Sequence, residues 1–422
     1  MRNPSVTGFT TKIVHQDRQK TIEHGSLLKP VHATVAYGYE DAKELAAVFQ
    51  GKQSGYTYGR QINPTVGALE EKISVMEQGL STVAFATGMA AIGTTLFALL
   101  REGDHMVSSS FLFGNTNSLF NSFSTHGISV SFVDATDAKA VAAEVRDNTR
   151  LVFVETIANP RTQIADLAAI GQLCQERGLV YVVDNTMTSP YLFCPKAVQA
   201  SVALNSLTKY ICGHGNALGG AVTELGSFDW GAFVNIDPLY RKGDPQLWGI
   251  TQIRKKGLRD FGAAIGPEAA NRIATGAETL ALRMTRQCAN AMAVAQMLQA
   301  HPKVRTVYYP GLEQHPQHER AREHFRLFGG LLSFELTAEV DIWTFLNRLE
   351  IIVKSSNLGD NRTLAIPVAH TIYHEMGAER RASMGIADNL VRFSVGIEEQ
   401  EDLLADIQQA LSSALACARA EL

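Results

Sequence analysis

The feature that most constrains the fold of this chain is a strand, a helix and a second strand that follow one another near its middle. Leu151–Val154 is a short apolar run, as is typical of a strand buried on both faces of a sheet. Apolar residues then recur at helical spacing over Ile164–Leu173, and Gly178 provides a stop signal. Leu179–Val183 is the next apolar run. Because a connection of this kind joins parallel strands by a right-handed crossover, the segment predicts an α/β sheet.

The texture of the sequence divides the chain into three parts. Residues 1–62 are polar, with aromatic and glycine punctuation, and predict an arm rather than a core. Residues 63–264 alternate apolar strands with amphipathic helices and predict a large domain. Residues 265–422 contain a long helical stretch over Pro267–Gln299 and a final helix over Glu399–Ala416, and they predict a smaller α+β domain with a mostly antiparallel sheet. A chain of 422 residues is long enough for two packed units.

Composition excludes several classes of protein. The formal net charge of −4 lacks the basic field that general nucleic-acid binding needs. Five scattered cysteines without a C-x-x-C pair are typical of a reducing compartment, and they predict neither disulfides nor a zinc site. The N-terminal residues hold no secretory apolar region, and the uncharged stretch Thr82–Leu100 carries too much Thr and Gly for a membrane span. We therefore expect a cytoplasmic protein that binds no nucleic acid, membrane or metal.

Three other signals have ordinary explanations. His315, His318 and His324 lie close together, but the Glu, Gln and Arg residues around them indicate a solvated face rather than a metal site. The basic run at residues 254–259 indicates a surface segment or a subunit contact in an acidic chain. The glycine-rich residues 213–220 lack the G-x-G-x-x-G spacing of a dinucleotide site.

Polar side chains follow three of the predicted strands at the point where each strand ends. Glu155–Pro160 follows the first, Asp184–Thr186 the second, and Asn205–Tyr210 follows a third apolar run, Ser201–Leu204. Ligands of open parallel sheets sit at the carboxyl ends of the strands. A single polar cluster would be explained by the wetness of loops. Three clusters with Asp, Asn, Ser, Thr and Lys predict a pocket for an anionic, nitrogenous ligand.

A glycine at the start of a further helix bears on the anionic part of that ligand. Thr87–Ile92 opens the helix, so its first backbone N–H groups and the helix dipole are available to a phosphate. Ordinary helix capping would explain the same residues, and for this motif taken by itself capping is the better explanation.

Six short motifs follow one another along the chain. They are Tyr58–Thr65, Thr87–Ile92, Glu155–Pro160, Asp184–Thr186, Ser206–Tyr210 and Val391–Glu398. Together they resemble the Cys/Met-metabolism family of pyridoxal-phosphate (PLP) enzymes, and most closely its O-acylhomoserine sulfhydrylases. The family also includes cystathionine γ-synthase and the cystathionine and methionine γ-lyases. The resemblance extends from about Thr10 to Leu404.

The resemblance implies a fold and an assembly. The fold is the aspartate-aminotransferase-like α/β fold (PLP fold type I), with a mainly parallel, seven-stranded sheet in the large domain and a smaller α+β C-terminal domain. The assembly is a homotetramer built from dimers whose active sites span two subunits. The N-terminal arm of residues 1–62 would contact the neighbouring subunit.

The resemblance also implies roles around the ring of bound pyridoxal 5′-phosphate. Lys209 would bond to the cofactor aldehyde and later act as the catalytic base. A lysine beside a cationic ring and shielded from water has a lowered pKa, which suits both tasks. Asp184 would pair with the pyridine nitrogen and keep it protonated, so that the ring draws electrons from the substrate. Asn159 would hydrogen-bond the phenolic oxygen.

Two anionic groups receive partners by the same resemblance. The phosphate would be held by Gly88, Met89, Ser206 and Thr208, joined by Tyr58 and Arg60 of the neighbouring subunit. Arg392 would bind the α-carboxylate of a small amino-acid substrate through a bidentate fork. Outside this motif, an arginine on a strand is more often an exposed surface residue.

One position departs from the family in a way that bears on the reaction. The family usually has a tyrosine that stacks on the cofactor and helps to protonate the leaving group, whereas this chain has Phe113, which can stack but cannot donate a proton. Expulsion of a thiolate benefits from a general acid because thiols have a pKa of about 8.5. Expulsion of a carboxylate, with a pKa of about 4, needs less help. Phe113 therefore favours an acyl-homoserine substrate, unless a water or another side chain supplies the proton.

A second segment points the same way. Ser356–Leu364 contains an Asn-x-Gly-Asp sequence that resembles the sulfhydrylases more than the Ser-Leu-Gly form of the synthases and lyases, and Asn357 is predicted to bind substrate. The following segment, Ile366–His374, departs from the usual run of the family. His370 and His374 therefore receive no role.

These features predict γ-replacement on O-acetyl- or O-succinyl-homoserine with sulfide or a thiol, giving homocysteine or cystathionine. The alternative within the family is γ-elimination from methionine or cystathionine, which releases 2-oxobutyrate and ammonia. A cofactor-binding protein without catalysis is a third alternative, and the presence of Lys209, Asp184 and Arg392 argues against it. The acyl group and the sulfur nucleophile stay open at this point.

Overall fold

The central strand–helix–strand unit forms as predicted in the computed structural model, which describes residues 7–20 and 22–414. β4 (Thr149–Glu155) leads through α7 (Leu167–Arg177) to β5 (Val180–Asp184), and the two strands pair in parallel. The apolar run within β4 is at most 1% exposed. The helix ends where Gly178 adopts a φ of 62°, a conformation that glycine reaches without strain.

The large sheet has seven strands in the order β1-β7-β6-β5-β4-β2-β3. Its other members are β1 (Ser81–Phe85), β2 (His105–Ser109), β3 (Ser129–Val133), β6 (Val202–Asn205) and β7 (Gly220–Glu224). β7 runs antiparallel to both neighbours, and the other pairs are parallel. This is the mainly parallel sheet that the resemblance implied.

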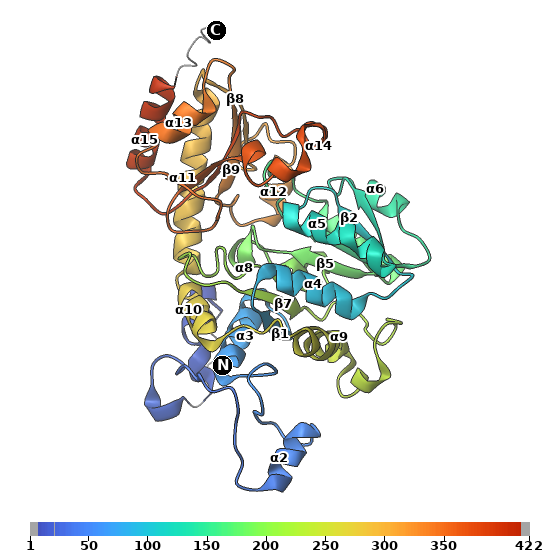
Figure 1. Ribbon diagram of the computed structural model, residues 1–422. Coiled ribbons are helices and arrows are strands. Elements are labelled where there is room, and N and C mark those ends of the chain that lie inside the picture. The colour runs from blue at the N-terminus through green and yellow to red at the C-terminus, as the bar shows by residue number, and fades with distance from the viewer. Residues whose placement is uncertain (1–6, 21, 415–422) are drawn as a thin grey trace.

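Helices cover both faces of the large sheet (Figure 1). They are α3 (Pro64–Glu77), α4 (Gly88–Leu99), α5 (Gly114–Ser122), α6 (Ala138–Ala143), α7, α8 (Ser189–Leu192) and α9 (Trp248–Gln252). Two separate apolar clusters lie against the sheet, one including α3 and α7 and the other including α4, α5 and α9. Because both faces are covered, the strands carry continuous apolar runs rather than an alternating pattern.

A second sheet of five strands lies above the large sheet in Figure 1. Its order is β10 (Val353–Lys354), β11 (Leu364–Pro367), β12 (Leu390–Ser394), β9 (Leu331–Leu336) and β8 (Val304–Tyr308). Only the short β10–β11 pair is parallel. Its apolar cluster also includes residues of α11 (Leu280–Ala300), α13 (Ile342–Arg348) and α15 (Gln400–Ser413). The smaller, mostly antiparallel domain is therefore confirmed. The last two residues of the predicted final helix, 415 and 416, lie outside the described residues.

The long helix predicted over Pro267–Gln299 is wrong in one respect, because two helices occupy this stretch. Residues 278 and 279 separate α10 (Pro267–Ala277) from α11 (Leu280–Ala300). Arg283 of α11 donates from Nη2 to the carbonyl oxygen of Gly276, at 2.8 Å. A side chain thus satisfies a carbonyl at the end of α10, which allows the chain to turn. Both helices share one apolar pattern, so the break was hidden in the sequence.

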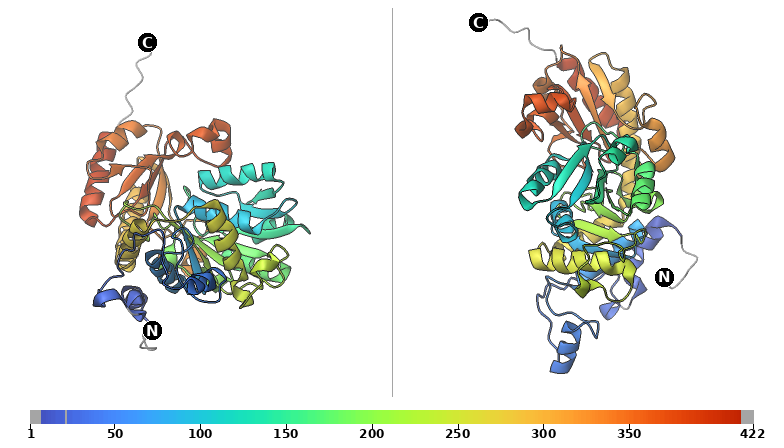
Figure 2. Two further views of the ribbon diagram at one scale, coloured as in Figure 1. Left: turned by 60° about the horizontal axis from the view of Figure 1, so that its bottom comes forward. Right: turned by 90° about the vertical axis from the view of Figure 1, so that its right-hand side faces the viewer.

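The N-terminal residues form an anchored portion and a projecting portion. α1 (Phe9–Val14) packs against the large domain through Ile13, which is fully buried. Residues 26–62, which include α2 (Ala42–Phe49), extend away from the body of the molecule in Figures 1 and 2. We call residues 26–62 the projecting portion.

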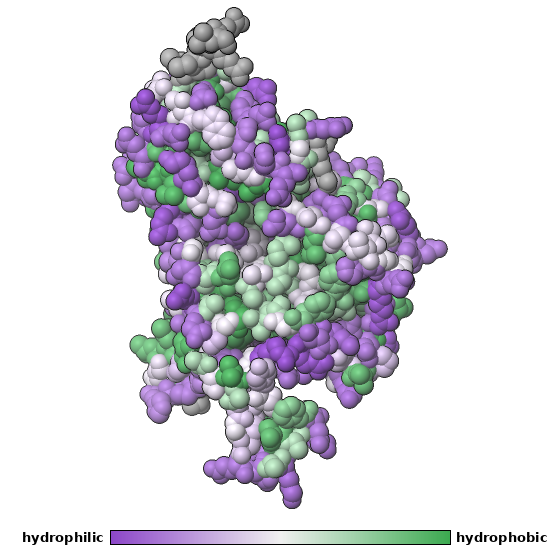
Figure 3. Space-filling view, viewed as in Figure 1, coloured by the Kyte–Doolittle hydropathy of each residue, from purple (hydrophilic) through white to green (hydrophobic). Residues whose placement is uncertain are grey.

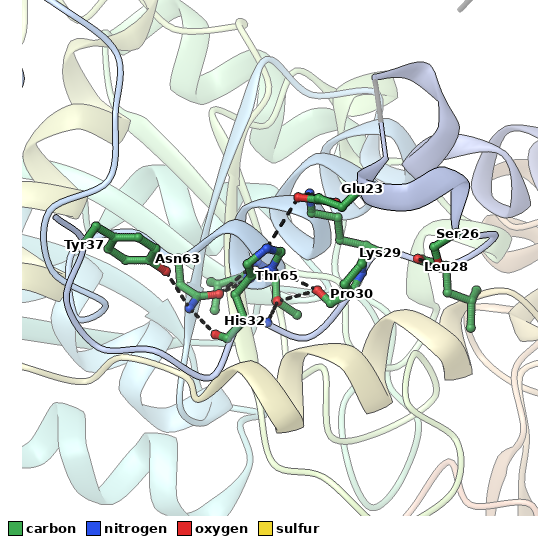
Figure 4. A network of polar contacts seen from close by, with 10 residues as sticks. Glu23, Ser26, Leu28, Lys29, Pro30, His32, Tyr37, Asn63 and Thr65 are labelled. Atoms are coloured by element: carbon green, nitrogen blue, oxygen red, sulfur yellow. Dashed lines mark hydrogen bonds and ion pairs between the residues drawn. The ribbon is translucent and has the colours of Figure 1, made fainter. Parts of the chain in front are cut away.

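The base of the projecting portion is fixed on the start of α3 (Figure 4). Asn63 caps this helix, because its Oδ1 accepts the N–H groups of Thr65 and Val66. Its Nδ2 donates to the carbonyl oxygen of His32 at 2.7 Å and to the hydroxyl of Tyr37 at 3.2 Å. The N–H of His32 in turn donates to Oγ1 of Thr65, at 2.9 Å. One helix cap therefore also holds the base of the projecting portion.

The projecting portion exposes large apolar side chains. They are Leu27, Leu28, Val31, Val35, Phe49, Tyr56, Tyr58 and Ile62. Figure 3 shows green and white residues on this part of the chain, at the bottom of the view. Contiguous exposed apolar surface is typical of interaction sites.

Two further findings concern the described part of the chain. Cys174, Cys194, Cys212 and Cys288 are free thiols. The fifth cysteine, Cys417, lies outside the described residues. None of the helices within residues 7–20 and 22–414 has the length and apolar character that crossing a membrane would need.

Candidate active site

A cavity of about 730 Å³ lies at the carboxyl ends of β4, β5 and β6. The starts of α4 and α5 and residues 355–358 of the smaller domain also line it. It brings together ten predicted site residues: Gly88, Met89, Phe113, Asn159, Asp184, Ser206, Thr208, Lys209, Asn357 and Arg392. Polar residues at the ends of parallel strands thus converge on one cavity, as expected for this kind of sheet.

Lys209 follows β6 and its amine contacts the smaller domain. Nζ donates a hydrogen bond to Oδ1 of Asn357, at 2.8 Å. Burial, and then the positive charge of Arg392, lower the pKa of Lys209 to about 8. An amine with this pKa is partly neutral near neutral pH, so it can act as a nucleophile and as a base.

Two carboxyl groups end neighbouring strands at the cavity. Glu155 of β4 and Asp184 of β5 are register partners, and both line the cavity. Burial, and then the charge of Asp184, raise the pKa of Glu155 to about 8. Burial also raises the pKa of Asp184, against hydrogen bonds from Thr186. A buried carboxylate is stabilised by a cation such as a protonated ring nitrogen.

The start of α4 approaches the turn after β6 closely. Thr87 caps the helix, because its Oγ1 accepts the N–H of Ala90 at 2.9 Å. A Cβ added to Gly88 would lie 2.8 Å from Cβ of Ser206, so only glycine allows this approach. The hydroxyl of Thr208 donates to a carbonyl of the following loop, at 3.2 Å. The helix N-terminus and the hydroxyl of Ser206 together suit a phosphate.

Arg392 reaches the cavity from β12 and is only 2% exposed, so it is not a surface residue. Its Nη2 donates to the carbonyl oxygens of Ser356 and Asn357, at 2.9 and 3.1 Å. Its Nη1 donates to Oδ1 of Asn159, at 3.4 Å. Its Nε has no hydrogen-bond partner among the described residues. Burial lowers the pKa of Arg392 to about 10. An orphaned N–H on a buried guanidinium fits a carboxylate ligand.

Phe113 precedes α5 and lines the cavity. Its backbone N–H donates to Oε1 of Glu155, at 2.8 Å. The nearby hydroxyl of Tyr373 is buried and donates to the carbonyl oxygen of Asn159 at 2.6 Å, and Tyr373 does not line the cavity. Among the described residues, no tyrosine, cysteine or histidine lines the cavity.

Tyr58 and Arg60 are not brought to the cavity of their own chain. Both lie on the projecting portion, and Tyr58 is 44% exposed. The guanidinium of Arg60 lies 5.4 Å from the centre of the Tyr58 ring and bonds the carbonyl oxygen of Arg259. Their exposure is compatible with service to a neighbouring subunit, which stays a prediction.

Several residues of the site were not assigned a role from the sequence. Glu155 and Thr87 stood within the recognised motifs, and their position at a strand end and a helix cap was the available signal. Tyr373 lies between the short helices η8 (Val368–His370) and η9 (His374–Met376), in the segment that departs from the family. Neither of the two unassigned histidines of that segment lines the cavity.

Two segments outside the cavity differ from their predicted surroundings. His315 is buried rather than solvated, because the turn before α12 (His318–His324) packs its Nε2 within 3.3 Å of Oγ1 of Thr162. In the basic run, Arg254 is an internal contact and donates to Oε2 of Glu70 at 2.8 Å. No group of three or more His, Cys, Asp or Glu side chains among the described residues is placed to hold a metal.

The cavity fits pyridoxal phosphate by the chemistry of its walls. The amine of Lys209, the carboxylate of Asp184 and the glycine-led start of α4 match the aldehyde, the ring nitrogen and the phosphate. The unpartnered Nε of Arg392 matches the carboxylate of an amino acid. With the two-sheet α/β architecture, these features define a fold type I PLP-dependent enzyme.

Comparison with known sequences identifies the family. The sequence profile of the Cys/Met metabolism PLP-dependent enzymes matches residues 10–412. An L-methionine γ-lyase of Fusobacterium nucleatum subsp. polymorphum is 37% identical over 408 residues, which cover 96% of this chain and 98% of the relative. An O-acetyl-L-homoserine sulfhydrylase of Leptospira meyeri is 36% identical over 406 residues, covering 91% and 92% of the two chains. The chain belongs to the Cys/Met-metabolism family of PLP-dependent enzymes, and PLP is its cofactor.

Solved structures share the fold. A Campylobacter jejuni chain provisionally assigned as an O-acetylhomoserine (thiol)-lyase, which carries a pyridoxyl-lysine monophosphate, matches with a TM-score of 0.91 and 29% identity over 96% of this chain and 100% of that chain. Cystathionine γ-synthase from Xanthomonas oryzae pv. oryzae, in complex with cystathionine, matches with a TM-score of 0.86 and 31% identity over 97% and 98%. Relatives named for γ-replacement and for γ-elimination occur at similar identity, so identity alone does not distinguish the two reactions.

Proposed function

We propose that the protein catalyses γ-replacement on an O-acyl-homoserine, in which sulfide or a thiol displaces the acyl group and gives homocysteine or cystathionine. The observation that carries the proposal is Phe113 at the cavity, with no tyrosine, cysteine or histidine among the described lining residues. A carboxylate leaves readily without a proton, because its acid has a pKa of about 4. A thiolate leaves less readily, because its pKa of about 8.5 makes a general acid valuable.

Arg392 and Asn357 would hold the amino acid in place. The buried guanidinium of Arg392 would bind the α-carboxylate through Nε and a second N–H. Asn357 accepts a hydrogen bond from the amine of Lys209 at its side-chain Oδ1, and another from the guanidinium of Arg392 at its backbone carbonyl oxygen. The substrate's reacting carbon would therefore lie between a fixed carboxylate anchor and the base.

Lys209 would move the protons of the reaction. Bound PLP supplies an electron sink for the carbanion that forms when the α-proton leaves. Nζ of Lys209, once released from the cofactor, takes the α-proton and later shuttles a proton at the β-carbon. Its lowered pKa of about 8 increases the fraction of the neutral form that each proton abstraction requires. Asp184 would hold the ring nitrogen in its protonated state.

We also propose the assembly and the location. The exposed apolar residues of the projecting portion, with Tyr58 and Arg60, would contact a second copy and complete its phosphate site in a homotetramer built from dimers. The free thiols of the described residues suit the reducing cytoplasm. The proposed domain limits are residues 1–62, 63–264 and 265–422. Dilution to monomers, with the assembly state measured by light scattering, should abolish activity. Activity that persists in monomers would refute the shared site.

The second candidate is γ-elimination from methionine or cystathionine. The observation that favours it is the 37% identity with an L-methionine γ-lyase. Water at the mouth of the cavity would then supply the proton that Phe113 cannot.

Steady-state kinetics distinguishes the two reactions. The values of kcat/KM would be measured with O-acetyl- and O-succinyl-homoserine, each with sulfide and with cysteine, and with methionine and cystathionine alone. We expect an acyl-homoserine with a sulfur nucleophile to give the highest value, by at least ~10-fold, given the leaving-group difference. A higher value for methionine than for every acyl-homoserine would refute the proposal.

A further inference from the structure

A buried carboxyl group at the cavity has no role in the proposed reaction. Glu155 is the last residue of β4 and is 8% exposed. Its register partner on the next strand is Asp184, so two carboxyl groups lie side by side at the same sheet edge. When two carboxyls share a buried site, repulsion and desolvation favour one charge over two.

The cations of the cavity are engaged elsewhere. The amine of Lys209 is bonded to Asn357, and the guanidinium of Arg392 is bonded to two carbonyl oxygens and to Asn159. No salt bridge to Glu155 is formed by the lysines, arginines and histidines of the described residues. A negative charge on Glu155 would therefore lack a counter-ion, unlike a charge on Asp184 once a cationic ring nitrogen faces it.

The remaining groups that face Glu155 do not supply positive charge. Tyr373, which lies between η8 and η9, is buried next to it, and its hydroxyl is committed to the carbonyl oxygen of Asn159. The backbone N–H of Phe113 donates to Oε1 of Glu155 at 2.8 Å. This bond fixes the residue directly before α5, whose aromatic ring is predicted to stack on the cofactor.

We propose that Glu155 is a positioning residue that works in its protonated form. Through its side-chain Oε1 it accepts the N–H of Phe113, and so fixes the residue whose ring would cover the cofactor. By staying neutral it leaves Asp184 as the single charged carboxylate, directed to the ring nitrogen. This proposal rests on the proposed cofactor contacts of Asp184 and Phe113 and is independent of the choice of substrate.

Glu155→Gln tests the charge and the hydrogen bond separately. Glutamine keeps the size of the side chain and the acceptor for the N–H of Phe113, but it can never carry a negative charge. Glu155→Ala removes both. If the neutral form is the working form, Glu155→Gln should bind PLP within ~3-fold of the wild type, whereas Glu155→Ala should bind it at least ~10-fold more weakly. If the charge is needed, Glu155→Gln should be as weak as Glu155→Ala.

Two substrate-free measurements supply the readouts, namely infrared spectra of the holoenzyme and PLP titration of the apoenzyme. Difference infrared spectra of the wild type at pH 7 should show the carbonyl stretch of a protonated carboxyl that is missing in Glu155→Gln. The equilibrium affinity of the wild type for PLP should decrease above about pH 8, as Glu155 ionises, and Glu155→Gln should lack this decrease. The matched control is Glu224→Gln, which changes a buried glutamate at the end of β7 outside the cavity and should leave the PLP titration unchanged.

The outcomes decide the proposal. The proposal would be overturned by absence of the infrared band, or by loss of PLP binding in Glu155→Gln. It would also be overturned if the affinity of Glu155→Gln for PLP still decreased above about pH 8. If Glu155→Ala fails to fold, the glutamine variant and its infrared spectrum still decide. Because no amino-acid substrate is present, a wrong choice between γ-replacement and γ-elimination would leave every readout unaffected.

Discussion

Replacement of Phe113 by tyrosine tests the link between leaving group and proton donor. The substitution adds one hydroxyl to a ring that lines the cavity and whose backbone is fixed by the 2.8 Å bond from its N–H to Glu155. The added phenol, with an ordinary pKa of about 10, can protonate a departing thiolate. It has little to offer a departing carboxylate, which is stable as an anion. The variant should therefore gain γ-elimination and leave γ-replacement nearly unchanged.

The magnitude follows from the two leaving groups and from the cavity. Their pKa values differ by ~4.5 units, which corresponds to ~6 kcal/mol as an upper limit for what a proton donor can recover. General acids typically contribute ~10²–10⁴-fold. A cavity of about 730 Å³ leaves the leaving group room to sit away from the new hydroxyl. We therefore expect the lower end, a ~10²-fold rise in kcat/KM for methionine or cystathionine, which corresponds to ~2.7 kcal/mol.

The assay compares substrates within one preparation. Release of 2-oxobutyrate from methionine and cystathionine would be followed with a coupled dehydrogenase, and homocysteine formation from O-acetyl-homoserine and sulfide with a thiol reagent. Phe111→Tyr is the matched control, because Phe111 is close in sequence but does not line the cavity. If Phe113→Tyr leaves the ratio of elimination to replacement unchanged, or if Phe111→Tyr raises it equally, the reasoning about the missing proton donor is refuted.

Three further predictions concern the cofactor and the substrate carboxylate. Lys209→Ala should lose the visible absorption band of lysine-bound PLP and at least ~10²-fold in kcat, so a coloured variant with normal turnover would contradict its role. Arg392→Lys should raise KM for an acyl-homoserine by ~10–100-fold, since a charge-assisted bidentate contact contributes about 1.5–3 kcal/mol, and an unchanged KM would exclude this contact. Capture of PLP by the apoenzyme requires the neutral amine of Lys209, which predominates only above its pKa of about 8. Stopped-flow absorbance should therefore show the rate rising ~10-fold per pH unit below that value and levelling above it, and a rate that falls with pH would contradict it.

The sequence predicted those parts of the fold and site that depend on local patterns. The apolar run Leu151–Val154 and the stop at Gly178 were sufficient for a parallel crossover, because few other arrangements bury such a strand on both faces. The polar residues after β4, β5 and β6 converged on one cavity because the ends of parallel strands meet at one edge. The PLP-dependent family followed from six motifs.

Features that depend on contacts between distant segments could not be predicted. The break between α10 and α11 depends on Arg283 reaching back to a carbonyl, while the apolar pattern runs on without interruption. The burial of His315 depends on its contact with Thr162, which is far away in the sequence. The raised pKa of Glu155 depends on its burial and then on the charge of Asp184, its register partner across the sheet. The roles proposed for Tyr58 and Arg60 would depend on a second copy of the chain.

The cavity lies between two sheets that are formed by different parts of the chain, so each part could be exchanged without the other. Asp184 ends β5 and Lys209 follows β6 of the larger sheet, whereas Arg392 lies on β12 of the smaller sheet and Asn357 follows its strand β10. A hybrid that took residues 265–422 from a relative would thus acquire that relative's contacts to the amino acid. It would keep the cofactor contacts of Lys209 and Asp184. The hydrogen bond from the amine of Lys209 to Asn357 joins the two parts, so an active hybrid must keep a hydrogen-bond acceptor at position 357.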